Sequence, residues 1–239
     1  MLSVEDALIH ISSNVPPTIV VSRRVDRDLV GHVLAEDAKS VEAVPAFRAS
    51  IVDGYAVHIP EGAKSNVKGV FPVAFSSHAQ AAEVQRLKPN QIARITTGAA
   101  LPPGSSAVVM VEDTLLHAKT EDGSEEAEIE VLTDEVEPNE NVREVGSDVE
   151  AGEVVMRRGE GISSVGGEFG LLASVGLQDV LIYKKPRVGV LSTGDEIVPH
   201  NRQGELQLGE VRDTNRPTLL TAVTAQGFEA IDLGIASDK

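Results

Sequence analysis

Four segments of the sequence combine carboxylates, hydroxyls and glycines closely enough to do chemistry. They are residues 50–56, 94–104, 141–148 and the paired stretches 192–196 and 212–216. In the second segment, Thr-Thr-Gly leads into Pro-Pro-Gly, a tight loop whose hydroxyl and backbone N–H groups suit an anion. The first segment contains an Asp-Gly pair between apolar flanks, which is equally typical of a turn. Taken one at a time, each segment is more often a structural loop than a site.

The fourth segment follows an apolar run, residues 188–191, that has the length and β-branching of a buried strand. Hydroxyls, a glycine and acids at the carboxyl end of a parallel strand lie where α/β sheets bind ligands. A helix is then predicted to start at residues 213–215 and to end at Gly227. The next strand is predicted at residues 230–235. The expected apolar face of this helix is Leu219, Leu220 and Val223. A β-α-β unit is therefore predicted.

A parallel pair of strands cannot cover both of its faces, and parallel sheets are normally buried on both sides. We therefore expect residues 186–239 to be the first β-α-β unit of a truncated α/β domain. On this interpretation the 239 residues are a fragment, or they complete their fold against another chain.

The remaining patterns predict a mixed α and β, multidomain fold. Short apolar runs separated by turn residues between 46 and 143 favour a β-rich module, a small sandwich or barrel. Within it, Pro72 should restrict its strand to an edge of the sheet. The module interrupts a discontinuous α+β domain made of residues 1–45 and 144–185. Expected elements of that domain are a helix at 3–11, strands at 18–21, 31–37, 152–156 and 180–183, and a helix at 167–174.

Composition excludes several classes of protein. The net charge of −16 opposes general binding of a phosphate backbone, so we expect no nucleic-acid partner. The absence of cysteine excludes disulfides, thiolate metal sites and a cysteine nucleophile. No apolar run reaches the ~18 residues of a membrane span and no signal peptide opens the chain, which predicts a cytoplasmic protein without membrane insertion. No motif of a serine hydrolase, a P-loop enzyme or a classical dehydrogenase is present.

Read together, the segments form an ordered set of motifs. These are Ser-x-x-Asp-Gly-Tyr-Ala at 50–56, Thr-Gly-x-x-x-Pro-x-Gly at 97–104, Ala-Val-Val-x-x-Glu at 107–112, Asn-x-Arg-x-x-Gly-x-Asp at 141–148, Gly-Leu-Leu-Ala at 170–173, Ser-Thr-Gly-Asp-Glu at 192–196 and Arg-Asp-x-Asn-Arg at 212–216. The set resembles the N-terminal portion of the molybdenum insertase family of molybdenum cofactor biosynthesis, which includes bacterial MoeA and the gephyrin E domain.

The chain departs from the family pattern in four places. Residues 104–109 read Gly-Ser-Ser-Ala-Val-Val where the family has Gly-Ala-Asp-Ala-Val-Val, so one acid is missing. The segment 165–169 lacks the usual Pro-Ser-Glu-Ile helix start. The sequence also ends before the family's second glycine-rich loop and its C-terminal β domain.

The resemblance implies a molybdopterin molybdenumtransferase, an enzyme that inserts molybdate into adenylated molybdopterin and releases AMP with the help of Mg²⁺. It also implies a homodimer, formed through the discontinuous domain, and a molybdopterin-binding α/β domain at 186–239. The cleft would lie between the β module of one subunit and the α/β domain of the other. The implied catalytic residues are Asp53, Thr97 and Asp148. The implied substrate-binding residues are Ser192, Thr193, Gly194, Glu196, Arg212, Asp213 and Asn215.

The acids of these motifs fit such substrates only if a cation is present. Two like charges about 5 Å apart repel by roughly 3 kcal/mol at an effective dielectric constant of about 20. Mg²⁺, which binds one or two carboxylates together with substrate phosphates, would turn this repulsion into attraction. The sequence does not assign its ligands. Bidentate contacts to phosphate or molybdate are expected from Arg94, Arg143, Arg212 and Arg216.

Two alternatives stay open. A gephyrin-like scaffold could keep the fold without the chemistry, with receptor or cytoskeletal partners that bind only regions absent from this sequence. An inactive fragment is the other alternative, because the expected pterin domain is incomplete.

Overall fold

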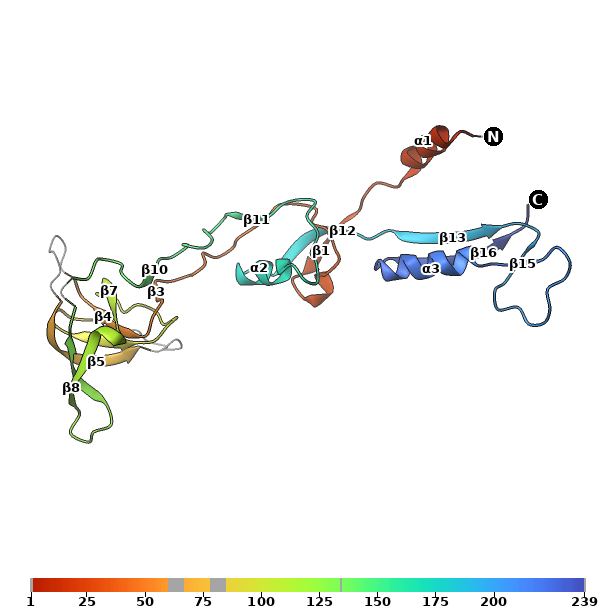
Figure 1. Ribbon diagram of the computed structural model, residues 1–239. Coiled ribbons are helices and arrows are strands. Elements are labelled where there is room, and N and C mark those ends of the chain that lie inside the picture. Colours follow the sequence, from red (N-terminus) through yellow and green to blue (C-terminus); the bar gives the residue numbers. More distant parts are fainter. Residues whose placement is uncertain (1, 60–66, 78–84, 134, 239) are drawn as a thin grey trace. The chain divides into compact units, whose positions relative to one another are not determined.

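The computed structural model describes residues 2–59, 67–77, 85–133 and 135–238, which form a mixed α and β fold (Figure 1). The chain divides into two compact units. Unit 1 consists of residues 1–38, 156–173 and 178–239, and unit 2 of residues 39–155 and 174–177. The expected three-part division, with boundaries at 45/46, 143/144 and 185/186, stays a prediction.

The described residues contain short strands, three α-helices and two 3₁₀ helices. In chain order these are α1 Val4–Asn14, β1 Val20–Arg24, η1 Arg27–Leu29, β2 Ala38–Lys39, β3 Ala49–Ser50, β4 Gly54–Val57, β5 Gly69–Ser77, β6 Ile92–Ile95, β7 Ala107–Met110, η2 Val111–Asp113, β8 Thr114–Lys119, β9 Glu126–Val131, β10 Val142–Arg143, β11 Val154–Met156, α2 Glu168–Ser174, β12 Asp179–Tyr183, β13 Arg187–Thr193, β14 Ile197–Val198, β15 Val211–Arg212, α3 Asn215–Ala225 and β16 Glu229–Ala236. None of the described helices is long and apolar enough to cross a membrane.

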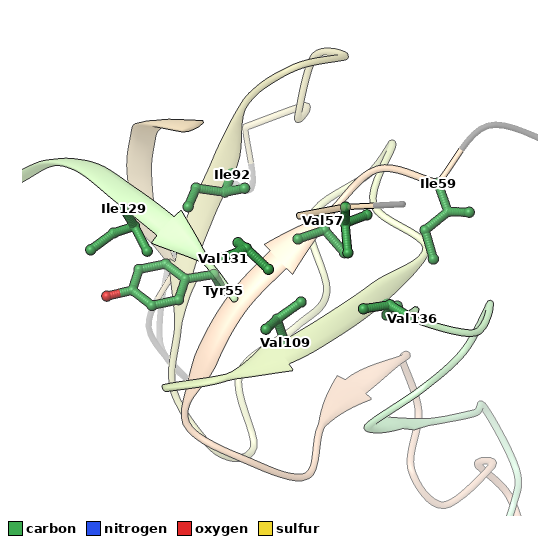
Figure 2. Close-up of a cluster of buried hydrophobic side chains, with 10 residues drawn as sticks. Tyr55, Val57, Ile59, Ile92, Val109, Ile129, Val131 and Val136 are labelled. Carbon is green, nitrogen blue, oxygen red and sulfur yellow. The ribbon is translucent and has the colours of Figure 1, made fainter. Parts of the chain in front are cut away.

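Unit 2 is built on a six-stranded sheet with the order β7-β4-β6-β5-β9-β8. Alternation along β4 directs Tyr55 and Val57 to one face and Ala56 to the other, so both faces carry an apolar cluster. Figure 2 shows the first cluster, to which side chains of β4, β6, β7 and β9 contribute. The strands β4 and β7 thus read as continuous apolar runs because the sheet is covered on both sides there.

The expectation that Pro72 marks an edge strand is wrong. Strand β5, which contains Pro72, lies between β6 and β9 inside the sheet. Pro72 faces Glu128 of β9, but the parallel pairing with β6 begins only at Val73. Proline has no N–H to donate and is tolerated because this part of β5 has a strand partner on one side only.

In unit 1, β1 and β12 pair antiparallel, from Val20 with Tyr183 to Arg24 with Asp179. Helix α1 begins as predicted at a Ser3 cap, whose hydroxyl accepts a hydrogen bond from the Asp6 N–H at 3.1 Å. The predicted strand at 31–37 does not form. Its residues Val33 and Leu34 make only isolated bridges, because their partners lie on two different segments of the chain.

The predicted β-α-β unit is present. β13 and β16 are parallel neighbours, with Arg187 opposite Glu229 and Thr193 opposite Ala236. Helix α3 connects them and packs on β13 and β16 (Figure 1). Gly227 follows its end with φ +75°, the left-handed conformation expected of a helix stop. Leu219 departs from the expected apolar face, since it is 53% exposed.

Gly54 begins β4, the strand that lies between β6 and β7. A Cβ there would lie 2.9 Å from the Val109 carbonyl carbon, and closer still to its oxygen. We predict that Gly54→Ala lowers the free energy of unfolding by about 3 kcal/mol, near the top of the range for overpacking, as measured by urea denaturation. Gly170→Ala is the control, because nothing lies within 4 Å of that Cβ and alanine favours the helix. Equal stability of both variants would contradict the prediction.

Candidate functional site

Asp53 and Thr97, from the first two sequence motifs, meet directly in unit 2. Oδ1 of Asp53 accepts hydrogen bonds from the Thr97 backbone N–H at 2.7 Å and from its hydroxyl at 3.0 Å. These two bonds, assisted by the nearby charge of Arg94, hold the pKa of Asp53 below its usual value, although partial desolvation opposes them. The carboxylate therefore stays ionised, and Oδ2 takes no part in either bond.

The third motif joins the first two through the backbone. The Ile51 N–H donates to the Asn141 carbonyl at 3.1 Å, and β10 pairs with β3 so that Val142 lies opposite Ser50. The Gly98 N–H donates to the Ser50 carbonyl at 2.8 Å. Three segments that are far apart in the sequence thus converge at β3.

Asp148, the third predicted catalytic residue, forms an ion pair with Arg143 of the same motif. Arg143 donates both Nε, at 3.2 Å, and Nη2 to the carboxylate. The Asp148 backbone N–H donates to the Val44 carbonyl at 3.0 Å, which fixes the position of the loop. Both side chains are substantially exposed, so the pair contributes little to stability. The charge of Asp148 is already matched by the chain itself.

Tyr55 is buried two positions after Asp53 and was not predicted as a site residue, although it stands in the first motif. The Tyr55 hydroxyl donates to Glu126 at 2.8 Å and accepts from Arg94 at 3.0 Å, and the Arg94 guanidinium lies 5.0 Å from the ring centroid. Burial, followed by the hydrogen bond to Glu126, raises the pKa of Tyr55 to about 12. Tyr55 therefore remains protonated at neutral pH. The sequence carries no signal for these contacts beyond the motif itself, because they depend on Tyr55 facing Arg94 across β4 and β6.

The motif residues of unit 1 form a second cluster. Asp213 is 2% exposed and accepts from the Ser192 hydroxyl at 3.0 Å, the Arg216 N–H at 3.2 Å and Arg216 Nε at 2.8 Å. Arg216 also pairs with Asp232 of β16. Burial raises the pKa of Asp213, but the hydrogen bonds and charge of Arg216, helped by Ser192, outweigh burial and leave it below the usual value. The cluster ties the start of α3 to β13 and β16.

The other residues of unit 1 that were predicted to bind substrate lie on different elements. Arg212 donates to the carbonyls of His200, Arg202 and Gly204, and so holds a loop. Gly194 has φ +140°, and a Cβ there would lie 2.5 Å from the Glu196 carboxylate. Thr193 ends β13 and Asn215 begins α3.

An open hollow of about 510 Å³ lies at the carboxyl ends of β13 and β16, where sheets of this kind bind ligands. Its lining includes Gly194, Asp195 and Arg216. Of the seven residues predicted to bind substrate, Gly194 alone lines this hollow directly. Ser192 does not line the hollow. Its hydroxyl donates to Asp213, which also accepts a hydrogen bond from Arg216 of the lining.

The residue types present fit a magnesium ion only in part. Within residues 2–238, leaving out the gaps named above, no three His, Asp or Glu side chains gather to hold a metal. Asp53 is exposed and ionised, and its Oδ2 takes no part in the bonds with Thr97. Such a carboxylate suits Mg²⁺ that takes most of its ligands from water and substrate phosphates.

Comparison with known proteins places this architecture in a family. Residues 2–176 match the family profile of the MoeA N-terminal region (domain I and II). The chain belongs to the MoeA family. It is 36% identical over 214 residues to the molybdopterin molybdenumtransferase of Haemophilus influenzae, covering 89% of this chain and 49% of that protein. It is 37% identical over 204 residues to the gephyrin of Dictyostelium discoideum, covering 80% of this chain and 27% of that protein.

Solved structures agree with the placement in the MoeA family. The crystal structure of the molybdopterin biosynthesis MoeA protein from Pyrococcus horikosii superposes with a TM-score of 0.80 at 30% identity. The match covers 100% of this chain and 58% of that one. The chain thus spans about half the length of the MoeA-family enzymes it matches.

The cluster around Arg216 makes the stability of unit 1 depend on acid pH. Hydrogen bonds and charge from Arg216 lower the pKa values of Asp213 and Asp232 in the folded chain, so their ionised forms add stability above the ordinary carboxyl pKa. This stability is lost as the pH falls through the lower folded values. We predict that the urea midpoint of unit 1 falls between about pH 5 and about pH 2. Asp232→Asn should weaken this dependence, whereas Glu205→Gln, at an exposed position, should not. An unchanged profile in Asp232→Asn would contradict the prediction.

Proposed function

We propose that this chain supplies the N-terminal half of a molybdopterin molybdenumtransferase. The substrates would be adenylated molybdopterin and molybdate, and the products AMP and a molybdopterin that carries molybdenum. Support comes from membership of the MoeA family and from relatives named for this activity. The observation that carries the proposal is the Asp53–Thr97 pair, which holds an ionised carboxylate beside a hydroxyl at the surface of unit 2.

Asp53 is proposed to face the substrate phosphates with Thr97, and its Oδ2 is the candidate ligand of Mg²⁺. When bound, Mg²⁺ would neutralise phosphate charge and polarise the bond to be hydrolysed. The Thr97 hydroxyl and N–H keep the carboxylate ionised and in one orientation. Arg94 is bonded to the Tyr55 hydroxyl and to no carboxylate among the described residues, so its charge is available to an anion.

The remaining predicted roles are revised by the contacts. Arg143, Arg212 and Arg216 each bind acceptors within the chain, so they are proposed to shape the site rather than grip the substrate. Asp148 keeps its proposed place in the site through its pair with Arg143. Ser192 and Asp213 are proposed to support the hollow in unit 1, and Thr193, Gly194, Glu196 and Asn215 remain candidates for contact with the pterin or phosphate.

The domain arrangement completes the proposal. We propose a discontinuous α+β domain that forms a homodimer, an inserted β module, and the opening of a molybdopterin-binding α/β domain at 186–239. In such a dimer the site of unit 2 would meet the α/β domain of a second subunit, so each site would use two chains.

We predict that this chain releases AMP from adenylated molybdopterin in the presence of molybdate and Mg²⁺, and that Asp53→Asn reduces the rate by at least about a hundredfold while substrate still binds. Asparagine keeps the size of the side chain and removes its charge. AMP is measured by chromatography, and substrate binding by calorimetry. The control is Asp122→Asn, at the tip of the β8–β9 hairpin, which should retain the parent rate. Equal rates of AMP release in the parent and Asp53→Asn would remove Asp53 from the mechanism. If the parent binds adenylated molybdopterin but releases no AMP, a scaffold or an inactive fragment would be favoured.

A further inference from the structure

Ser50 is buried, with 2% of its surface exposed, at the point where the three motifs of unit 2 converge. Its backbone N–H donates to the Ala99 carbonyl at 3.1 Å, and its carbonyl accepts from the Gly98 N–H at 2.8 Å. In β3 it also lies opposite Val142 of β10. The main chain of Ser50 is therefore bonded to the loop that carries Thr97, and it lies beside the strand that carries Arg143.

The Ser50 hydroxyl is used locally. It donates to the Val52 carbonyl at 2.6 Å and accepts from the Val52 N–H at 3.3 Å, which closes a tight turn over three residues. In the described residues, no other hydrogen bond reaches these two backbone groups of Val52. Removal of the hydroxyl would leave the Val52 N–H and carbonyl without this hydrogen-bond partner. Because Val52 is half-buried, the loss favours opening of the turn.

The turn leads straight into Asp53. On the far side of Asp53, its carbonyl accepts from the Val111 N–H at 3.1 Å, and Gly54 then enters the sheet. Asp53 is thus held between a strand, which cannot move without disturbing the core, and the turn that the Ser50 hydroxyl closes. A relaxed turn would rotate Asp53 away from Thr97, whose own position is set by the bond between Gly98 and Ser50.

We propose that Ser50 is a positioning residue, whose hydroxyl fixes the geometry of the Asp53–Thr97 pair. Its effect on turnover rests on the proposed function, but its effect on the pair does not. The general reason is that a catalytic group must be held close to one geometry, and a displacement of about 1 Å can cost a hundredfold in rate.

Ser40 offers a matched control. It is also buried, at 5% exposure, lies in the same unit, and its hydroxyl likewise donates to the backbone carbonyl two residues ahead, that of Glu42. Ser40→Ala therefore removes an equivalent bond away from the Asp53–Thr97 pair. A general loosening of unit 2 would affect the two variants alike.

The test is NMR of the whole chain at neutral pH, in which hydrogen exchange of the backbone amides is measured. In the parent, the Thr97 amide should be protected from exchange, because it donates to Asp53. In Ser50→Ala we expect this protection to fall at least about tenfold. The Ser124 amide, which donates to Asp122 at 3.1 Å, should not change. Ser40→Ala should match the parent at both amides.

Unchanged exchange of the Thr97 amide in folded Ser50→Ala would overturn the proposal, as would equal losses of protection at Thr97 and Ser124. If Ser50→Ala does not fold, Ser50→Cys carries the same test, because the thiol is similar in size but a weak donor. AMP release by Ser50→Ala should fall roughly tenfold or more. A parent chain that releases no AMP would refute turnover by this half alone, while leaving the NMR result to decide the role of Ser50.

Discussion

The close approach of Gly54 to Val109 is the constraint on which the site of unit 2 depends. Strand β4 fits between β6 and β7 because its first residue has no side chain, and the core clusters on both faces then hold it there. Asp53 directly precedes this residue, so its position is set by the sheet. Thr97 lies two positions after the end of β6 at Ile95, and the side chains of Asp53 and Thr97 meet because β4 and β6 are neighbours.

Electrostatics gives the two clusters different characters. In unit 2, Asp53 is exposed, ionised and bonded to a neutral residue, so its charge is available to an external cation. In unit 1, Asp213 is buried and its charge is matched by Arg216. The anionic substrates that we propose for this chain, whose net charge is −16, would need positive charge from a metal ion or from arginines without an internal partner. Of the four arginines predicted to contact the anion, Arg94 is the one whose hydrogen bond, within the described residues, goes to a hydroxyl and not to a carboxylate or a backbone carbonyl.

Much of the site could be predicted from motif residues, and its contacts could not. Ser192, Asp213 and Arg216 stay predicted site residues, and the structure adds that Asp213 and Arg216 are buried and that Asp213 is bonded to both of the others. Tyr55 was read as part of a motif, yet its link to Arg94 and Glu126 joins three strands and depends on their register. Pro72 led to the wrong prediction of an edge strand. The rule for proline assumes that an inner strand is paired on both sides along its full length, and β5 is not.

The sequence by itself determined the local elements and the motifs: the Ser3 cap of α1, the β-α-β unit from β13 to β16, and the residues now placed in the MoeA family. These follow from periodicity, capping and residue type, which act over a few positions. Tertiary structure alone decided which motifs meet, why residues 31–37 form bridges instead of a strand, and which charges are neutralised. These outcomes depend on contacts between segments that lie far apart in the sequence, such as Val20 with Tyr183 and Leu34 with Ile182, and local sequence does not encode such pairings.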